Sequence, residues 1–161
     1  MVLLCVDDDL EDIEVFCDAV KQVDATANCI AAYNGQQAFD ILESGLLPDY
    51  IFLDINMPVL AGMETLKAVR KNGRYRNIPV IMYSTTSDPS EIKSFKKEGA
   101  TDFLVKPNHF QDLCHALDSI MKNNKSKSYA GRVFKMISIP FHLLSVIPRG
   151  CFIIMPGYAA R

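Results

Sequence analysis

The amino-acid sequence predicts an α/β fold, in which a five-stranded parallel sheet carries helices on both faces. Five short apolar runs alternate along the chain with five longer segments whose apolar residues recur at helical spacing. Several of these runs contain no alternating polar residues, as is typical of strands buried on both faces of a parallel sheet. Strands and helices that alternate in this way favour right-handed crossover connections.

The first strand and helix are predicted close to the start of the sequence. Residues 2–6 are apolar and lead directly into Asp7, Asp8 and Asp9. Asp9 can cap the helix that follows, and Asp12 lies near the positive end of that helix. One face of the helix carries apolar residues at helical spacing, namely Ile13, Phe16, Val20 and Val23.

The second strand and helix show recognisable capping signals. Residues 28–33 are predicted to form the strand. Asn34 and Gln37 form a capping-box pattern for the next helix, and Gly45 suits its end because glycine accepts a left-handed backbone. We therefore expect this helix to run through Glu43.

The third predicted strand covers residues 50–53 and ends at a carboxylate. Its four residues are all apolar, which indicates burial on both faces of the sheet. Asp54 follows directly, so it should lie at the carboxyl edge of the sheet, where open α/β folds bind ligands. Gly62 permits a turn before the third helix.

The remaining elements continue the alternation. Strands are predicted at residues 78–83 and 101–105, and the helix between them has an N-cap at Asp88. That helix has few large apolar residues, so we expect it to be loosely held and mostly exposed, either as an ordinary surface helix or as a movable one. A last helix is predicted after Asn108.

Composition and charge divide the chain into a domain and a tail. The chain has 161 residues, of which 49% are hydrophobic, enough for one core. Residues 1–122 carry 11 basic and all 19 acidic side chains, a formal charge of −8, whereas residues 123–161 carry a charge of +6. An acidic domain repels phosphates, so we expect no nucleic-acid partner. No signal peptide is predicted.

The cysteines do not suggest a metal site or a disulfide framework. There are five of them, an odd number, and none forms a C-x-x-C pair. We therefore expect reduced thiols and a cytoplasmic location.

Polar residues that follow four of the predicted strands should meet at the carboxyl edge. Asp7 and Asp8 end the first strand and Asp54 the third, while Ser84 and Lys106 follow the fourth and fifth. Neighbouring strands lie about 4.8 Å apart, so these side chains are within reach of one another. Clustered carboxylates repel, and they are stable at neutral pH with raised pKa values or a bound cation. An all-oxygen ligand set favours Mg²⁺.

Four motifs of the chain form a specific combination: Val6-Asp7-Asp8, Asp54 with Met57-Pro58 and Gly62 downstream, Ser84-Thr85 after an apolar strand, and Lys106-Pro107. Together they resemble the receiver domain of two-component response regulators, over about residues 1–122. The resemblance implies a flavodoxin-like fold with strand order 2-1-3-4-5. It points to the stand-alone, single-domain type of regulator.

The resemblance also implies the chemistry of the edge. Asp54 is expected to accept a phosphoryl group in a Mg²⁺-dependent phosphorelay. Asp7 and Asp8 match the acidic pair that holds Mg²⁺ together with Asp54, and the backbone carbonyl of Asn56 is a further expected ligand. Such a protein is a phosphoacceptor regulator, which catalyses only its own phosphotransfer and slow autodephosphorylation.

Three further residues have roles by resemblance. Ser84 matches the hydroxyl that bonds a phosphoryl oxygen, and Lys106 matches the lysine that pairs with it. Phe103 matches the aromatic residue that changes its packing on activation. Family members often hold the bond that corresponds to Lys106–Pro107 in the cis form.

The expected partners follow from the same resemblance. The phosphodonor is a sensor histidine kinase, and phytochrome-type kinases are one class of candidate. A downstream protein is expected to bind the face made by the fourth helix, the fifth strand and the fifth helix. A homodimer is left open, and a membrane partner is not favoured.

The same sequence lacks the motifs of two other functions. An aspartate-dependent phosphohydrolase would carry a second aspartate two positions after Asp54, where this chain has Asn56. A nucleotide triphosphatase needs a G-x-x-x-x-G-K-[ST] motif, which the sequence lacks. The alternative left open is a phosphorylation-independent interaction domain of the same fold.

The tail, residues 123–161, begins with a polar linker and continues as a basic, apolar segment. Lys135, Pro140 and Arg149 interrupt this segment, so it is a poor membrane-spanning helix. An extension past the natural end of the protein is the favoured interpretation. A membrane-surface segment and a partner-binding segment are the alternatives.

Overall fold

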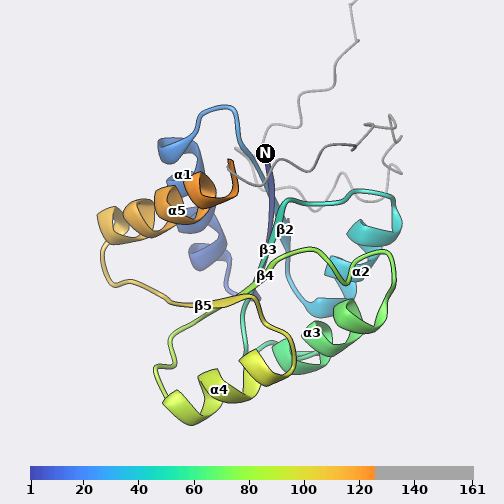
Figure 1. The fold of residues 1–161 in the computed structure, drawn as a ribbon. Coiled ribbons are helices and arrows are strands. Elements are labelled where there is room, and N and C mark those ends of the chain that lie inside the picture. The colour runs from blue at the N-terminus through green and yellow to red at the C-terminus, as the bar shows by residue number, and fades with distance from the viewer. Residues whose placement is uncertain (126–161) are drawn as a thin grey trace, which may run out of the picture.

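The computed structural model describes residues 1–125, which form a single five-stranded sheet. All neighbouring strands are parallel, in the order β2-β1-β3-β4-β5 (Figure 1). The predicted α/β class and the flavodoxin-like strand order are therefore confirmed. The strands are β1 (Val2–Val6), β2 (Asn28–Ala32), β3 (Tyr50–Leu53), β4 (Val80–Ser84) and β5 (Asp102–Val105).

Helices cover both faces of this sheet. α1 and α5 lie together on one face, whereas α2 and α3 lie on the other face, whose core α4 joins (Figure 1). The helices are α1 (Leu10–Val23), α2 (Gly35–Glu43), α3 (Gly62–Lys71), α4 (Pro89–Lys97) and α5 (Phe110–Lys125).

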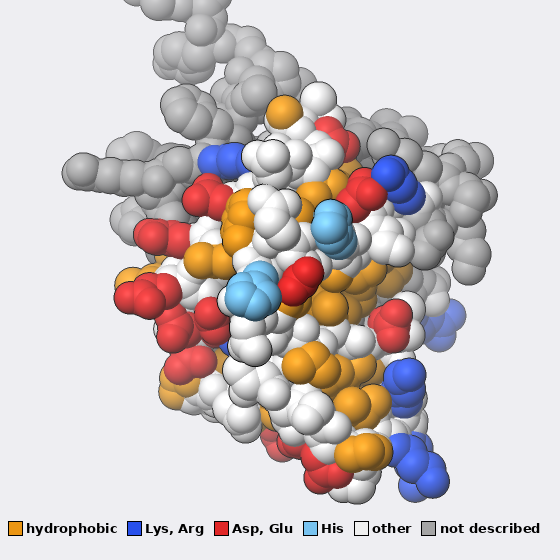
Figure 2. Space-filling model, turned by 90° about the vertical axis from the view of Figure 1, so that its left-hand side faces the viewer, with side chains coloured by type: hydrophobic (Ala, Val, Ile, Leu, Met, Phe, Trp, Pro, Cys, Tyr) orange, Lys and Arg blue, Asp and Glu red, His pale blue; other side chains and the backbone are white. Residues whose placement is uncertain are grey.

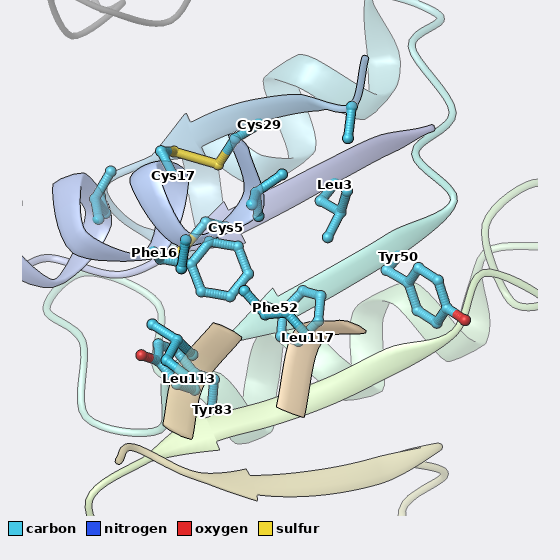
Figure 3. Packing of buried hydrophobic residues seen from close by; sticks show 14 of the residues in the cluster. Leu3, Cys5, Phe16, Cys17, Cys29, Tyr50, Phe52, Tyr83, Leu113 and Leu117 are labelled. Atoms are coloured by element: carbon cyan, nitrogen blue, oxygen red, sulfur yellow. A yellow bond between two sulfur atoms is a disulfide. The ribbon is translucent and has the colours of Figure 1, made fainter. Parts of the chain in front are cut away.

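Each face of the sheet has its own hydrophobic core. On the side of α1 and α5, the ring of Phe16 lies 4.7 Å from that of Phe52 and 5.4 Å from that of Tyr83, measured between centroids (Figure 3). On the other side, Leu53 of β3 packs in the same core as Leu66 of α3. Burial of one such side chain contributes about 1.5–3 kcal/mol. These layers fix the positions of the strand ends.

Helix ends follow the local signals in the sequence. The side chain of Asp9 accepts backbone N–H bonds from the first turn of α1, and Asn34 does the same for α2. Gly45 and Gly99 follow α2 and α4 with φ of 100°, the left-handed conformation that favours glycine. The predicted caps at Asp9 and Asn34 and the predicted helix end at Gly45 are confirmed.

Helix α4 has a small buried face. Phe95 is its one buried residue and packs into the core shared by α2 and α3. The remaining side chains of α4 are exposed or half-buried. The prediction that few of its apolar groups anchor this helix is confirmed.

One disulfide corrects the prediction from cysteine spacing. Cys17 of α1 and Cys29 of β2 are bonded, with their Cα atoms 5.4 Å apart (Figure 3). The expectation of reduced thiols is wrong for this pair, whereas Cys5 and Cys114 are free and buried. The pair carries no sequence motif because its proximity arises from the packing of α1 against β2.

The predicted tail lies almost wholly outside the described residues. Helix α5 continues to Lys125, past the predicted domain boundary at residue 122. Residues 126–161 are not described, so the three interpretations of the tail stay predictions. Within residues 1–125, no helix combines the length and the apolar character needed to cross a membrane.

Candidate functional site

Polar residues that end four strands lie along one edge of the sheet. Asp7, Asp54 and Lys106 directly follow β1, β3 and β5, and Ser84 is the last residue of β4. The N–H of Asp54 donates to the carbonyl of Val6 at 2.9 Å, and the N–H of Lys106 donates to the carbonyl of Ser84 at 2.9 Å. The sheet itself therefore sets the spacing of these residues.

Three carboxylates gather at this edge. Asp7, Asp8 and Asp54 each offer an oxygen, and these oxygens lie within 4.8 Å of one another. Asp7 and Asp54 are buried, whereas Asp8 is exposed. The backbone N–H of Asn56 donates to Oδ2 of Asp54 at 2.8 Å, which orients that carboxylate. A group of closely spaced carboxylate oxygens with one exposed member fits a hard divalent cation such as Mg²⁺.

The ammonium group of Lys106 already neutralises part of this charge. Its Nζ lies 2.7 Å from Oδ2 of Asp7, 2.7 Å from Oδ2 of Asp12 and 3.3 Å from Oδ1 of Asp54. Raised pKa values and a bound cation were the two expected ways to stabilise the carboxylates. The ion pairs with Lys106 are a third way, which that expectation left out. Asp12, which the sequence predicts only as a first-turn residue of the helix, is an additional partner of this ammonium.

Burial and ion pairing act in opposite directions on these groups. Burial raises the pKa of Asp7, although the hydrogen bonds from Lys106 and from the Asp9 backbone act against this shift. For Lys106, burial alone would lower the pKa, but hydrogen bonds to Asp12 and Asp7 and the charges of Asp7 and Asp54 outweigh it, so its pKa is raised. Lys106 is therefore a permanent cation at this edge.

The hydroxyl of Ser84 lacks a hydrogen-bond partner. Its Oγ is buried and no group within the described part of the chain bonds it. Leaving a buried hydroxyl unsatisfied costs about 1–3 kcal/mol. An incoming oxyanion at the end of β4 would supply the missing acceptor.

The loop after Asp54 holds α3 tightly against the site. A Cβ added at Gly62 would lie against the backbone of Asp54 and Ile55, so only glycine fits this close approach. The predicted turn is not the reason for glycine here, since the positive φ of 70° belongs to Val59. A left-handed backbone is a strained conformation for a β-branched residue.

The match with known sequences decides the family. Residues 3–118 match the response regulator receiver domain. The chain belongs to this family. Receiver domains bind Mg²⁺ at an acidic pocket, which is consistent with the group formed by Asp7, Asp8 and Asp54.

Individual relatives of this receiver domain are distant in sequence. The probable C4-dicarboxylate response regulator DctR of Bacillus subtilis is 27% identical over 92% of the chain, which spans 66% of that protein. The chemotaxis protein CheY1 of Helicobacter pylori is 27% identical, and the match covers 77% of the chain and 99% of CheY1. Among solved structures, CheY4 of Vibrio cholerae has 31% sequence identity to this chain. The two structures superpose with a TM-score of 0.66, over 74% of this chain and 97% of CheY4.

These relatives establish the general function. The receiver domain acts in two-component phosphorelay signalling as a phosphoacceptor regulator. Domains of this family interact with histidine kinases and with downstream targets. A phosphorylation-independent interaction domain, the alternative from the sequence, is not favoured.

Of two expectations about the β5 region of the receiver domain, the role of Phe103 stays a prediction and the cis peptide bond is wrong. Phe103 is half-buried, and its ring centroid lies 6.4 Å from that of Phe95 in α4, so it links β5 to that helix. The expected cis bond between Lys106 and Pro107 is wrong, because all peptide bonds of the described residues are trans. The geometry at the end of β5 instead follows from the backbone bond of Lys106 to β4.

The predicted residues of the receiver domain thus come together, with one addition. Asp7, Asp8, Asp54 and Lys106 meet as expected, and Ser84 lies on the same edge. Asp12 was missed as a member of the site. The sequence does place Asp12 in the first turn of the helix that follows the acidic run. Side chains of a helix tilt toward its N-terminus, so a carboxylate at this position is directed back toward the strand ends.

Proposed function

We propose that Asp54 accepts a phosphoryl group from the phosphohistidine of a sensor histidine kinase. The observation that carries this proposal is the convergence on one edge of a buried carboxylate, an ammonium and an unsatisfied hydroxyl, those of Asp54, Lys106 and Ser84. Each of these groups has a place in phosphoryl transfer to an aspartate.

In the proposed transfer, a carboxylate oxygen of Asp54 attacks the phosphorus atom. The bond between phosphorus and the histidine nitrogen breaks, and that nitrogen keeps the electron pair. The ammonium of Lys106, 3.3 Å from Asp54 Oδ1, pairs with a phosphoryl oxygen, and the Ser84 hydroxyl donates to another.

The same proposal includes a resident Mg²⁺ ion. Asp7, Asp8 and Asp54 would hold it, with the carbonyl of Asn56 as a further ligand, and the ion would neutralise charge on the phosphoryl oxygens. The closeness of the three carboxylate oxygens supports this assignment. Slow autodephosphorylation by water attack on the acyl phosphate is the expected way in which the signal ends.

The output of the switch is proposed to pass through Phe103. Attraction of Ser84 toward the phosphoryl group would free space at the end of β4, and Phe103 would move into it and away from Phe95. A downstream protein would then bind the face of α4, β5 and α5, which a homodimer could also use. The small buried face of α4 supports a helix that can shift.

The remaining proposals concern the type of kinase, the domain boundary and the location of the protein. A phytochrome-type kinase stays one candidate donor on the resemblance alone. The structure of the cyanobacterial phytochrome response regulator RcpA is 21% identical to this chain and supports only the fold. We assign residues 1–122 to the receiver domain, with α5 extending it to Lys125, and the rest to a linker and tail. A cytoplasmic location rests on the phosphodonor alone, since the Cys17–Cys29 disulfide removes the argument from reduced thiols.

Labelling with a small phosphodonor tests the acceptor. With Mg²⁺ and acetyl phosphate, the wild-type protein should gain one phosphoryl group, which is acid-stable and alkali-labile as an acyl phosphate is. Asp54→Asn should lose the label, whereas Asp18→Asn, which changes an exposed aspartate of α1, should keep it. Wild-type labelling of Asp54→Asn would show that the nucleophile is wrongly assigned.

A further inference from the structure

Within residues 1–125, the side chain of Asp12 contacts the site through Lys106. It lies in the first turn of α1, and its Oδ2 accepts a hydrogen bond from Lys106 Nζ at 2.7 Å. It is not among the carboxylates whose oxygens lie close enough together to share a metal ion, within the described residues. Its place in the site therefore needs an explanation other than metal binding.

The three contacts of the Lys106 ammonium differ in length. An ammonium group has three N–H donors, and three carboxylates surround it. The distances to Asp7 and Asp12 are 2.7 Å each, whereas the distance to Asp54 is 3.3 Å. Two short contacts hold the ammonium, and the contact to Asp54 is the longest of the three.

Asp12 is held in place independently of the site. Its backbone N–H donates to Oδ1 of the capping residue Asp9, and α1 packs along α5. A cation bound by Asp7, Asp8 and Asp54 would draw on the oxygens of Asp7 and Asp54. Of the three carboxylates around Lys106, Asp12 alone would then pair with the ammonium and not also with the cation.

We infer that Asp12 is a positioning residue, which holds the Lys106 ammonium beside Asp54 so that one N–H is ready for a phosphoryl oxygen. This inference rests on the proposed role of Lys106. The phosphoryl group replaces the long contact to Asp54, and the short contact to Asp12 persists. Asp12 touches neither the phosphoryl group nor the acceptor, and acts through Lys106.

Binding of beryllofluoride, a stable phosphoryl analogue, tests the inference. The dissociation constant is measured by ¹⁹F NMR titration at saturating Mg²⁺. Asp12→Ala should bind about threefold more weakly, since a partly exposed ion pair has a modest effect. Asp12→Asn, which keeps an acceptor without the charge, should be intermediate. Glu11→Ala, which removes a neighbouring exposed carboxylate, is the matched control and should bind no more weakly than wild type.

The sign of the effect separates positioning from simple charge. Removing a negative charge near an anion favours its binding, so weaker binding of Asp12→Ala cannot come from charge alone. In a Lys106→Ala background, Asp12→Ala should no longer weaken beryllofluoride binding, or should strengthen it. The ¹⁹F chemical shift of the bound beryllofluoride should then be the same with and without the Asp12 carboxylate.

The outcomes distinguish the inference from the function on which it rests. Unchanged or tighter binding by Asp12→Ala overturns the inference, because Asp12 would then be irrelevant or would compete for Lys106. Equal weakening in the Lys106→Ala background also overturns it. If wild type fails to bind beryllofluoride, or Asp54→Asn binds it equally, the proposed site fails as well.

Discussion

At the scale of single residues, the site is a balance between buried carboxylates and one ammonium. Asp7 and Asp54 are 1% and 6% exposed, so their charges have little contact with water. Lys106 offsets part of this charge in the absence of metal, at 2.7 Å from Asp7 and 3.3 Å from Asp54. The remaining excess of negative charge is what a divalent cation would neutralise.

The raised pKa of Asp7 predicts a pH dependence of stability. The folded state holds this proton to higher pH than the unfolded state, whose ordinary value is 3.8. The protonated Asp7 therefore stabilises the folded state fully below the unfolded pKa, and this stabilisation is lost as pH rises through the folded pKa. Asp7→Asn, which cannot ionise, should therefore gain stability relative to wild type as pH rises above about 4.

Chemical denaturation of both metal-free proteins between pH 3.5 and 7 measures this difference. Asp18→Asn serves as control, because it removes an exposed carboxylate and should show no such trend. A difference between Asp7→Asn and wild type that stays constant with pH would mean that burial does not control the Asp7 proton.

At the scale of elements, the disulfide ties α1 to β2. Closing a loop with a sequence separation of 12 should stabilise the fold by about 3 kcal/mol, mainly by restricting the unfolded chain. Reduction, or the Cys17→Ser variant, should lower the free energy of unfolding by about that amount. Denaturation with and without reductant measures it, and Cys114→Ser is the control for the loss of a buried thiol. Equal stability of the oxidised and reduced proteins would contradict the bond.

Helix α4 and strand β5 are expected to respond together to the phosphoryl group. Phe95 and Phe103 are in ring contact, so a move of Phe103 should loosen α4. Hydrogen exchange should change within residues 88–121 on adding beryllofluoride and Mg²⁺, while α2 stays unchanged. The same exchange in both states along this segment would argue against the proposed switch.

The elements were predictable because their signals are local. The caps at Asp9 and Asn34, and the glycine that ends α2, need only a few neighbouring residues to act, so sequence patterns find them. Asp12 and Lys106 lie 94 positions apart, and no pattern links them before the topology is known. The Cys17–Cys29 bond was missed for the same reason, since its proximity depends on tertiary packing.

At the scale of the whole molecule, a metal ion should act as a stabilising ligand. At ten times its dissociation constant, Mg²⁺ should raise the free energy of unfolding of wild type by about 1.4 kcal/mol, because it binds only the folded state. Asp8→Asn should gain much less at the same Mg²⁺ concentration, whereas Asp18→Asn should gain as much as wild type. Melting curves with and without Mg²⁺ decide this, and an equal gain in Asp8→Asn would remove Asp8 from the metal site.

The ion pairs of Lys106 also bear on how the chain can be assembled. The carboxylates of this edge come from β1, α1 and β3, whereas their counter-charge arrives only after β5. If β1, α1 and β3 came together on a growing chain before Lys106 had emerged, these carboxylates would lack their ammonium partner. Fragments that end before β5 are therefore expected to be less stable than the whole domain, because the residue after the last strand supplies the charge that the end of the first strand requires.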